Sequence, residues 1–596
     1  MRALLLTSVL YLCACGAGTD GPAPPALPDE RPTPDAGVLP EARLPDAGPP
    51  DAGKPDAGPQ SAWPALQTSI PRYTLRLSEA DFQALEATRK DPEKLHVPDT
   101  FVHEGRQYTA ELSYRGRSTK TDDRILKRSW QVRFSPEQRF EGVKRLELLA
   151  AWKDGGYLTE KLWYDLAAAA GLQVPRARYV HVDIVRVQPD GSEHAAYAGV
   201  FTELESVTKD FLKAHGLDDD GDIYRCGMHD CELREPPRAH WMQPWEKRTN
   251  EDQPWDRLWT LMERLNRTPP HALPAVLEQN LELDDYLTWM AIDEFIANAT
   301  QQDARSFLVY SRETGRWSFV PWDLNNALSL YNRTNGVRQS TRVTRPLFTF
   351  SAYDLEAYEN WRHRRDDLGM ADLTVAWSTL NTRILDDPGL RARALERLQT
   401  LLDTLLREEE LVPRIQAMHT LLAPYILPTA GRSTPLDPYV DPAYAAASAD
   451  YLARYVRGRR DFLQKNLQAY ERLDDGALVL DRVGRDDSGA FYVQLHNRGT
   501  EPVSLEGLHL TGATRAPLQG TLPAHTLLPG EVLTLREDAA DPTLRLGIQL
   551  EPLRPELGLF PADGFGAIDL LWPGPLQPGE AYGRIPRGAE TYGPVN

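Results

Sequence analysis

The clearest alternation of apolar and polar positions lies between Gln301 and Ala327. Two short apolar runs, FLVY and WSFV, flank the segment SRETG, whose Thr-Gly pair is a turn signal. This pattern predicts a β-hairpin, with Asp303 just before the first strand and Asp323 just after the second. Because a hairpin returns the chain to its starting point, we expect the two carboxylates to lie close together.

Strand and helix patterns alternate over residues 62–472. YTLRLSEADFQALEA predicts a strand and then a helix capped by Ser78, with Asp81 three residues further on. RQYTAELSYRGRS and SWQVRFSP are typical of strands, and GGYLTEKLWYDLAAAAGLQVPRARYVHVDIV predicts a helix, a stop at Gly171 and a strand. AAYAGVFTELESVTKDFLKAHG predicts a strand and a helix, and LDDYLTWMAIDEFIANATQQD predicts the helix before the hairpin. Since the residues from about 345 to 472 have mostly helical periodicity, we expect one α+β domain over residues 62–472.

The pattern changes in residues 473–596, which contain short β runs separated by turn residues. In FYVQLHN one face takes Phe491, Val493 and Leu495, so a small all-β, immunoglobulin-like sandwich is expected. The stretch FYVQLHNRGTEPVSLEGLHL and the later LLPGEVL resemble the lamin-tail domain. That resemblance implies a binding or adhesive accessory role and no catalytic residues, and an unrelated β-sandwich is the alternative.

The N-terminal residues predict export. Residues 1–15 read as a bacterial lipoprotein signal peptide, because an apolar run too short to span a bilayer ends in LCAC, which resembles a lipobox. Cys15 would then carry the lipid and anchor the chain to a bacterial membrane, at the outer membrane or cell surface. An ordinary signal peptide cut nearby is the alternative. Residues 16–61, rich in Pro, Ala, Asp and Gly and repeating PDAG, are expected to be a disordered spacer.

Composition and charge narrow the classes of partner. The 596 residues are 41% hydrophobic and 26% charged, which is ordinary for a soluble globular protein. The formal net charge of −19 argues against a nucleic-acid or anionic-membrane surface. We therefore expect no nucleic-acid partner, and the sequence predicts no particular oligomeric state.

Two of the four cysteines lie outside the signal segment, in the stretch CGMHDC. Because Cys226 and Cys231 are an isolated pair in an exported chain, a local disulfide is expected. A metal site is the alternative, but this stretch offers only His229 and Asp230 as further ligands.

Five segments, taken in order, resemble the CotH (spore coat protein H) kinase family, which has an atypical protein-kinase-like fold. They are LSYRGRSTKTDDRILKRSWQVRF, LELLAAWKDGGYLTEKLWYDLAAAAGLQVPRARYVHVDI, AYAGVFTELESVTKDFL, DIYR and DARSFLVYSRETGRWSFVPWDLNNAL. The resemblance covers roughly residues 72–470. Each segment alone is a weak match, and five in the same order are a strong one.

The resemblance implies roles for residues of the hairpin. Asp323, in PWDLN, matches the metal-binding aspartate, and Asp303 matches the catalytic aspartate near the acceptor hydroxyl. Asn325 stands where the family often has a further metal contact. Ser306 stands where the family commonly has Asn, and a hydroxyl binds Mg²⁺ more weakly than an amide carbonyl does.

The resemblance also implies residues that hold the nucleotide. Lys127 matches a lysine that would contact the phosphates as a point charge, with Arg115 nearby. Glu205 matches a glutamate that would orient Lys127 through an ion pair. The implied cofactors are ATP and Mg²⁺ (or Mn²⁺).

Each of these residues also has a purely structural interpretation. The alternatives are a strand-end cap for Asp323, a turn N-cap for Asp303, a solvated basic face for Lys127 and a surface ion pair for Glu205. Trp317 and Trp322 are expected to belong to the hairpin core and not to a platform for adenine.

The resemblance implies an enzyme: a protein kinase that transfers phosphate from Mg-ATP to secreted or envelope proteins at the cell surface. A catalytically silent pseudokinase that serves as a binding or adhesion scaffold is the first alternative. A metal-dependent hydrolase using Asp303 and Asp323 is the second, although the sequence has no HExxH-type cluster or nucleophile elbow. The chain also has no Walker-type loop and no HRD or DFG triplet, so nucleotide binding is predicted by the resemblance alone.

Overall fold

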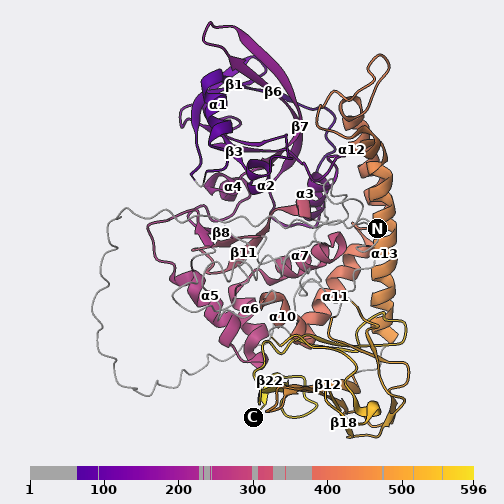
Figure 1. Ribbon diagram of the computed structural model, residues 1–596. Coiled ribbons are helices and arrows are strands. Elements are labelled where there is room, and N and C mark those ends of the chain that lie inside the picture. The colour runs from indigo at the N-terminus through magenta and orange to yellow at the C-terminus, as the bar shows by residue number, and fades with distance from the viewer. Residues whose placement is uncertain are drawn as a thin grey trace, which may run out of the picture. The chain divides into compact units, whose positions relative to one another are not determined.

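The computed structural model describes most of the chain after residue 62 (Figure 1). The described residues are 63–91, 93–226, 233, 242, 245–297, 306–326, 343, 379–472, 476–513, 516–552 and 555–595. All of them belong to one compact unit, Pro59–Asn596. Asp303, Cys15, Cys231 and the predicted spacer lie outside the described residues, and the predictions made for them stay predictions.

The N-terminal part of this unit is a closed barrel with the strand order β1-β2-β3-β4-β5-β7-β6 (Figure 1). Its strands are β1 (Arg72–Ser78), β2 (Val97–His103), β3 (Arg106–Arg115), β4 (Ser129–Phe134), β5 (Arg145–Leu149), β6 (Ala177–Val187) and β7 (Glu193–Glu205). Neighbouring strands are antiparallel except β1 and β6, whose parallel pairing closes the barrel. The interior is packed with aromatic side chains, mostly edge to face: Tyr73, Phe101, Tyr108, Phe134 and Phe140.

In the sequence, helices α1 to α4 lie between the barrel strands or directly after the last of them. They are α1 (Glu79–Ala87), α2 (Arg117–Thr121), α3 (Thr159–Ala169) and α4 (Lys209–Ala214). The predicted cap of α1 is confirmed, because Ser78 Oγ accepts a hydrogen bond of 3.0 Å from the backbone N–H of Asp81. The predicted stop after α3 is confirmed as well: Gly171 has a φ of +89°, a conformation that glycine adopts without strain.

A small antiparallel sheet and a group of helices follow the barrel. The sheet has the order β11-β10-β8-β9, with β8 (Asp222–Cys226), β9 (Trp245–Lys247), β10 (Ser306–Tyr310) and β11 (Trp317–Pro321). The helices are α5 (Asp256–Arg267), α6 (Leu273–Asn280), α7 (Leu283–Ile296), α10 (Thr379–Asp386), α11 (Pro388–Asp403), α12 (Glu408–Ile426) and α13 (Pro442–Arg472), with 3₁₀ turns η1 (Pro270–Ala272) and η3 (Leu324–Asn326). Helices α3 and α7 are buried on nearly all sides, in the largest hydrophobic core of the unit.

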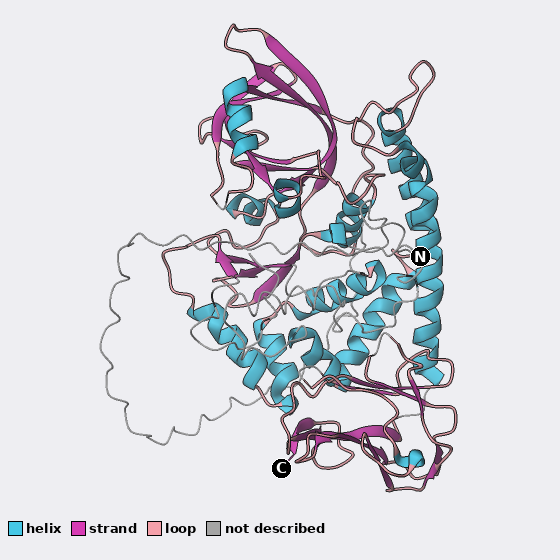
Figure 2. Ribbon diagram, viewed as in Figure 1, coloured by secondary structure: helices cyan, strands magenta, loops and turns pink. Residues whose placement is uncertain are grey.

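The C-terminal residues are strand-rich, with strands separate from those of the barrel (Figure 2). One sheet has the order β18-β13-β12-β21-β22, a second has the order β16-β15-β19-β20, and β14 pairs with β17. The strands are β12 (Leu478–Arg485), β13 (Phe491–Asn497), β14 (Val503–Ser504), β15 (His509–Thr511), β16 (Gly520–Thr521), β17 (Thr526–Leu527), β18 (Val532–Arg536), β19 (Leu557–Phe560), β20 (Asp569–Leu571), β21 (Ala581–Arg584) and β22 (Tyr592–Val595), with a 3₁₀ turn η5 (Pro542–Leu544). The predicted inner face is confirmed, since Phe491, Val493 and Leu495 are all buried in one core.

The α+β class and the all-β C-terminal part are therefore confirmed, and the specific likeness to a lamin tail stays a prediction. The closed barrel was not expected from the sequence, because its closure pairs strands that are about a hundred residues apart, such as Arg72 with His181. No helix among the described residues combines the length and the apolar character needed to cross a bilayer.

Candidate functional site

The predicted hairpin is present and carries Asp323 at one end. Strands β10 and β11 pair from Ser306 opposite Pro321 to Tyr310 opposite Trp317. Asp323 is the second residue after β11 and has a φ of +60°, the left-handed region that residues other than glycine enter rarely. A strained backbone of this kind is frequent at functional sites, so the conformation is consistent with a dedicated role for Asp323. Its pairing with Asp303 stays a prediction.

A second carboxylate, which the sequence interpretation missed, faces Asp323. Glu160, in the first turn of α3, is only 3% exposed, and its Oε2 atom has no hydrogen-bond partner among the described residues. Burial and then the charge of Asp323 raise the pKa of Glu160 to about 8, against the opposing effect of Arg115. A buried carboxyl group, Glu160, and a half-buried one, Asp323, are therefore close enough for the charge of Asp323 to disfavour ionisation of Glu160.

The sequence does contain a signal for Glu160. Helix α3 reads TEKLWYDLAAA and is buried on nearly all sides, so each of its charged residues needs a partner. Lys161 and Asp165 are four residues apart and pair with each other at 2.8 Å. Glu160 has no such partner within the helix. It is therefore the charged residue of α3 whose burial needs another explanation.

The other predicted metal contacts lie at the same end of the hairpin as Asp323. Ser306 begins β10 and is 2% exposed, and Asn325 lies in η3. The Asn325 Oδ1 atom is 3.5 Å from Lys153 Nζ. Among the described residues, no group of three or more His, Cys, Asp or Glu side chains is arranged to hold a metal ion. Carboxylate, amide and hydroxyl oxygens are nevertheless the donors that Mg²⁺ takes, usually with only one or two carboxylates.

A basic cavity of about 730 Å³ adjoins this end of the hairpin, because Trp322, the residue before Asp323, is part of its wall. Its cationic side chains come from the barrel segment and from the small sheet with its adjoining residues: Lys90, Lys94, Arg115, Lys120, Arg133, Arg145, Arg225 and Arg248. The acidic residues of the wall are fewer: Asp91, Glu147, Glu246 and Glu251. The cavity therefore has an excess of positive charge in a protein whose net charge is negative.

The crowding of these cations shifts their pKa values. Burial lowers the pKa of Lys94 to about 7, and the positive charges of Arg115 and Arg145 lower it further, although Glu147 opposes them. Burial likewise lowers the pKa of Arg145. Arg115 is paired with Glu147 at 2.7 Å, so one acidic group offsets several cations. An anion bound in the cavity would relieve this repulsion.

Trp317 and Trp322 have different environments. Trp317 is buried against Tyr224 and Tyr310, which confirms that it belongs to the hairpin core. Trp322 is half-buried, lies on the cavity wall and has the Arg115 guanidinium 5.7 Å from its ring centre. Trp322 packs against the hairpin core beside Phe307, as predicted, and it lines the cavity as well.

The expected ion pair between Lys127 and Glu205 does not form. The Lys127 ammonium donates hydrogen bonds to the Tyr157 hydroxyl, the Val200 carbonyl and, at 3.1 Å, the Asp437 carboxylate. Glu205 instead pairs with Arg176 at 2.8 Å and His215 at 2.9 Å. The expected pairing is wrong because each side chain is already satisfied by other partners.

Lys127 also does not fit the role of a phosphate contact. An ammonium has three N–H donors, and all three are used inside the protein. The side chain is 4% exposed, and burial lowers its pKa although Asp437 opposes this. Lys127 does not line the basic cavity, whereas Arg115 does. Of the two cations predicted to hold phosphate, the structure therefore places only Arg115 where an anion could reach it.

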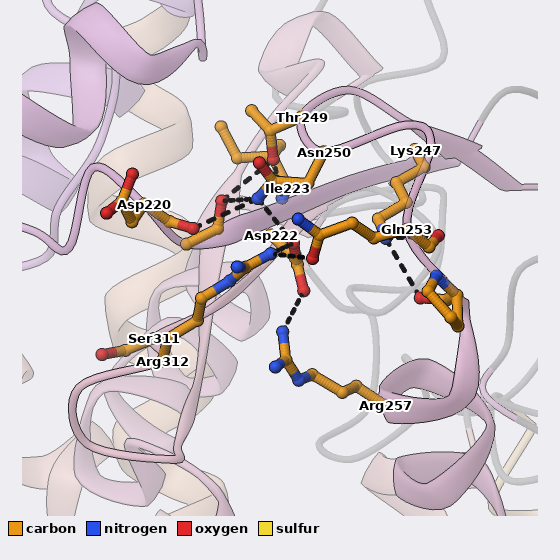
Figure 3. A network of polar contacts seen from close by, with 12 residues as sticks. Asp220, Asp222, Ile223, Lys247, Thr249, Asn250, Gln253, Arg257, Ser311 and Arg312 are labelled. Carbon is orange, nitrogen blue, oxygen red and sulfur yellow. Dashed lines mark hydrogen bonds and ion pairs between the residues drawn. The ribbon is translucent and has the colours of Figure 1, made fainter.

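A polar network holds the turn end of the hairpin to the rest of the small sheet (Figure 3). Asp222, in β8, is 1% exposed and accepts hydrogen bonds from Asn250 at 2.8 Å, Arg257 at 2.6 Å and Arg312 at 2.8 Å. Arg312 belongs to the hairpin turn, and Arg257 to α5. Figure 3 shows the two guanidinium groups approaching the Asp222 carboxylate from separate elements. The network thus orients the hairpin whose other end carries Asp323.

Comparisons with known proteins agree with the predicted resemblance. The model of a family described as CotH kinase protein matches residues 112–463. Inner spore coat protein H of Bacillus subtilis (strain 168) is 23% identical over 410 residues, which span 67% of this chain and 98% of that protein. The solved structure of a Helicobacter pylori proinflammatory kinase, CtkA, aligns with 61% of this chain and 95% of its own at 8% identity. Its TM-score of 0.22 is too low to establish a common fold.

The family match spans more than half of the 596 residues and includes the barrel from β3 onward, helix α3 and the hairpin with Asp323. The chain therefore belongs to the CotH kinase protein family and is an atypical kinase-like protein.

Proposed function

We propose that this protein is a phosphotransferase that moves the terminal phosphate of ATP to hydroxyl groups of secreted or envelope proteins. The observation that carries the proposal is the basic cavity next to Asp323, because phosphoryl transfer needs cations around the phosphates and a carboxylate at the metal. Mg²⁺ or Mn²⁺, when bound, would neutralise charge on the phosphate oxygens. Asp323 and Asn325 are the residues proposed to hold it, with Ser306 near them.

We propose the remaining roles from the residues of the cavity wall and from the family resemblance. Arg115 and the other cavity cations would hold the phosphates, in place of Lys127. Asp303 would orient the acceptor hydroxyl and accept its proton as the oxygen bonds to the terminal phosphorus, while the bond to the bridging oxygen breaks and ADP leaves. Trp322, which lines the cavity, is the candidate for contact with the adenine ring.

We propose the location from the predicted N-terminus. A lipid on Cys15 and the spacer of residues 16–61 would hold the folded unit at a bacterial membrane, in reach of secreted and envelope proteins. Cys226 and Cys231 would form a disulfide in that compartment.

The alternative is a pseudokinase that serves as a binding scaffold at the same location. Two observations favour it: the Lys127 ammonium is saturated by internal partners, and Ser306 replaces the Asn that is common in the family. A scaffold would keep the fold and the C-terminal sheets but would not turn over ATP.

The test is transfer of label from γ-labelled ATP by the purified full chain, with Mg²⁺ or Mn²⁺ and a generic protein acceptor. We expect label on the protein itself or on the acceptor, and a loss of at least about a hundredfold in Asp323→Ala, because the metal contact is removed. Asp219→Ala, which changes an exposed aspartate, is the control and should label like the unmutated chain. Absence of labelling with either metal would favour the scaffold.

A further inference from the structure

Glu160 is a buried charge without an evident role in the fold. Lys161 and Asp165, its charged neighbours on α3, neutralise each other at 2.8 Å, and Asp165 is also 3.7 Å from Arg414. Glu160 is buried to the same extent, but its Oε2 atom has no hydrogen-bond donor among the described residues. A buried carboxylate oxygen left in this way is costly for the folded state. The cost suggests that something absent from the protein chain itself satisfies it.

Among the charged groups around Glu160, Asp323 has the strongest electrostatic effect on it. Its charge acts on Glu160 more strongly than that of Arg115, Lys153 or Asp154. The packing agrees with this, because α3 lies against η3, the turn that directly follows Asp323. One turn further along α3, the Tyr164 hydroxyl lies near the backbone amide of Asp323. Two carboxyl groups from different elements are thus brought together, with Arg115 and Lys153 as the opposing cations.

We propose that Glu160 is a second carboxylate ligand of the divalent cation held by Asp323. Two carboxylates held close together repel each other, and a shared dication removes the repulsion and also satisfies the buried Glu160 oxygen. Oxygen pairs of this kind suit Mg²⁺ and Mn²⁺. The inference rests on the proposed function, because it assumes a cation at Asp323. It adds a ligand from α3 to those that the hairpin supplies.

The test measures cation binding directly. Mn²⁺ is titrated into the full chain and free Mn²⁺ is followed by electron paramagnetic resonance, with and without a non-hydrolysable ATP analogue. We expect Glu160→Gln, like Asp323→Asn, to weaken Mn²⁺ binding at least about tenfold. Asp165→Asn is the matched control: it changes a buried carboxylate of the same helix that pairs with Lys161, and it should leave Mn²⁺ affinity unchanged.

Thermal unfolding distinguishes a lost ligand from a damaged fold. Without metal, Glu160→Gln should unfold at a temperature equal to or above that of the unmutated chain, because the substitution removes the repulsion from Asp323. Mn²⁺ should raise the unfolding temperature of the unmutated chain and not that of Glu160→Gln. A Glu160→Gln protein that unfolds lower without metal and binds Mn²⁺ normally would show that Glu160 is structural, and would overturn the inference.

The remaining outcomes separate this inference from the proposed function. Glu160-dependent Mn²⁺ binding without any transfer of label supports the site and contradicts the kinase. Transfer of label with unchanged Mn²⁺ affinity in Glu160→Gln supports the kinase and overturns the site. An unmutated chain that binds no Mn²⁺ under either condition overturns the site as well.

Discussion

At the scale of single residues, the most consequential contact joins Lys127 to Asp437, which are 310 residues apart. Asp437 is 1% exposed and also accepts hydrogen bonds from the Val200 backbone at 2.8 Å and the Tyr157 hydroxyl at 2.9 Å. Gly199 makes the approach possible: its φ is +103°, and a Cβ at this position would overlap the Asp437 carboxylate. The barrel strand β7 is thus shaped to admit an aspartate from the loop after α12.

This pair leads to a prediction about stability. Asp437→Ala leaves the Lys127 ammonium buried without a counter-charge, and removing one partner of a buried ion pair costs about 3–5 kcal/mol. We expect a decrease of that size in the free energy of unfolding, measured by urea denaturation. Glu137→Ala, at an exposed position on the barrel, should change it by less than about 0.5 kcal/mol. A decrease below about 1 kcal/mol in Asp437→Ala would mean that Lys127 finds water or another acceptor.

At the scale of elements, different interactions hold the strands and the turn of the hairpin in place. Its strands bury Phe307, Val309 and Val320 in a small core, and its turn is tied to β8 through Arg312 and Asp222. Its other end carries Asp323, whose left-handed backbone has to be held in place by its surroundings. The contacts at the turn end therefore help to hold the end of the hairpin that carries Asp323.

The Asp222 network can be tested by removing the charge of Asp222 and one of its two acceptor oxygens. Asp222→Asn keeps the size of the side chain but places an N–H₂ group where the donors of Arg257 and Arg312 converge. We expect a loss of about 1–3 kcal/mol in the free energy of unfolding, with faster hydrogen exchange at the β10 amides. Asp220→Asn, which changes an exposed neighbour, is the control. Unchanged exchange in β10 would show that the network is not needed to hold the hairpin.

At the scale of the whole molecule, the distribution of charge matters more than its sum. The chain has 67 basic and 86 acidic residues, hence a net charge of −19, yet basic side chains converge on one cavity. Low-dielectric walls concentrate such a local field, so an acidic protein can still present a polyanion site. The net charge argues against a nucleic-acid surface but not against binding of a compact phosphate group.

The cavity leads to a prediction about phosphate binding and salt. We expect inorganic triphosphate to bind to the full chain, and the affinity to fall about tenfold between about 50 and about 500 mM NaCl, because salt screens charges. Arg145→Gln removes one cavity cation and should weaken binding about threefold to tenfold. Arg106→Gln, at an exposed position of the same barrel, is the control for calorimetric titration. Equal binding by both variants would place the triphosphate elsewhere.

Much of the local structure could be predicted from the sequence. The hairpin, the Ser78 cap, the stop at Gly171 and the inner face of β13 follow from periodicity and turn chemistry within a few residues. The order of the family motifs likewise follows from the chain alone, and the family match confirms it. These features are local, so the physical forces that produce them act between residues that are neighbours in the sequence.

The tertiary structure decided which charged groups meet. Burial and partners cannot be deduced from local pattern, so the sequence suggested Glu205 as the partner of Lys127, where the fold provides Asp437. Closure of the barrel, the convergence of cations on its cavity and the approach of Glu160 to Asp323 depend on contacts between distant segments. Long-range packing selects those contacts. Only the assembled core determines which polar side chains lose their contact with water and which neighbouring groups replace the lost hydrogen bonds or neutralise the charge.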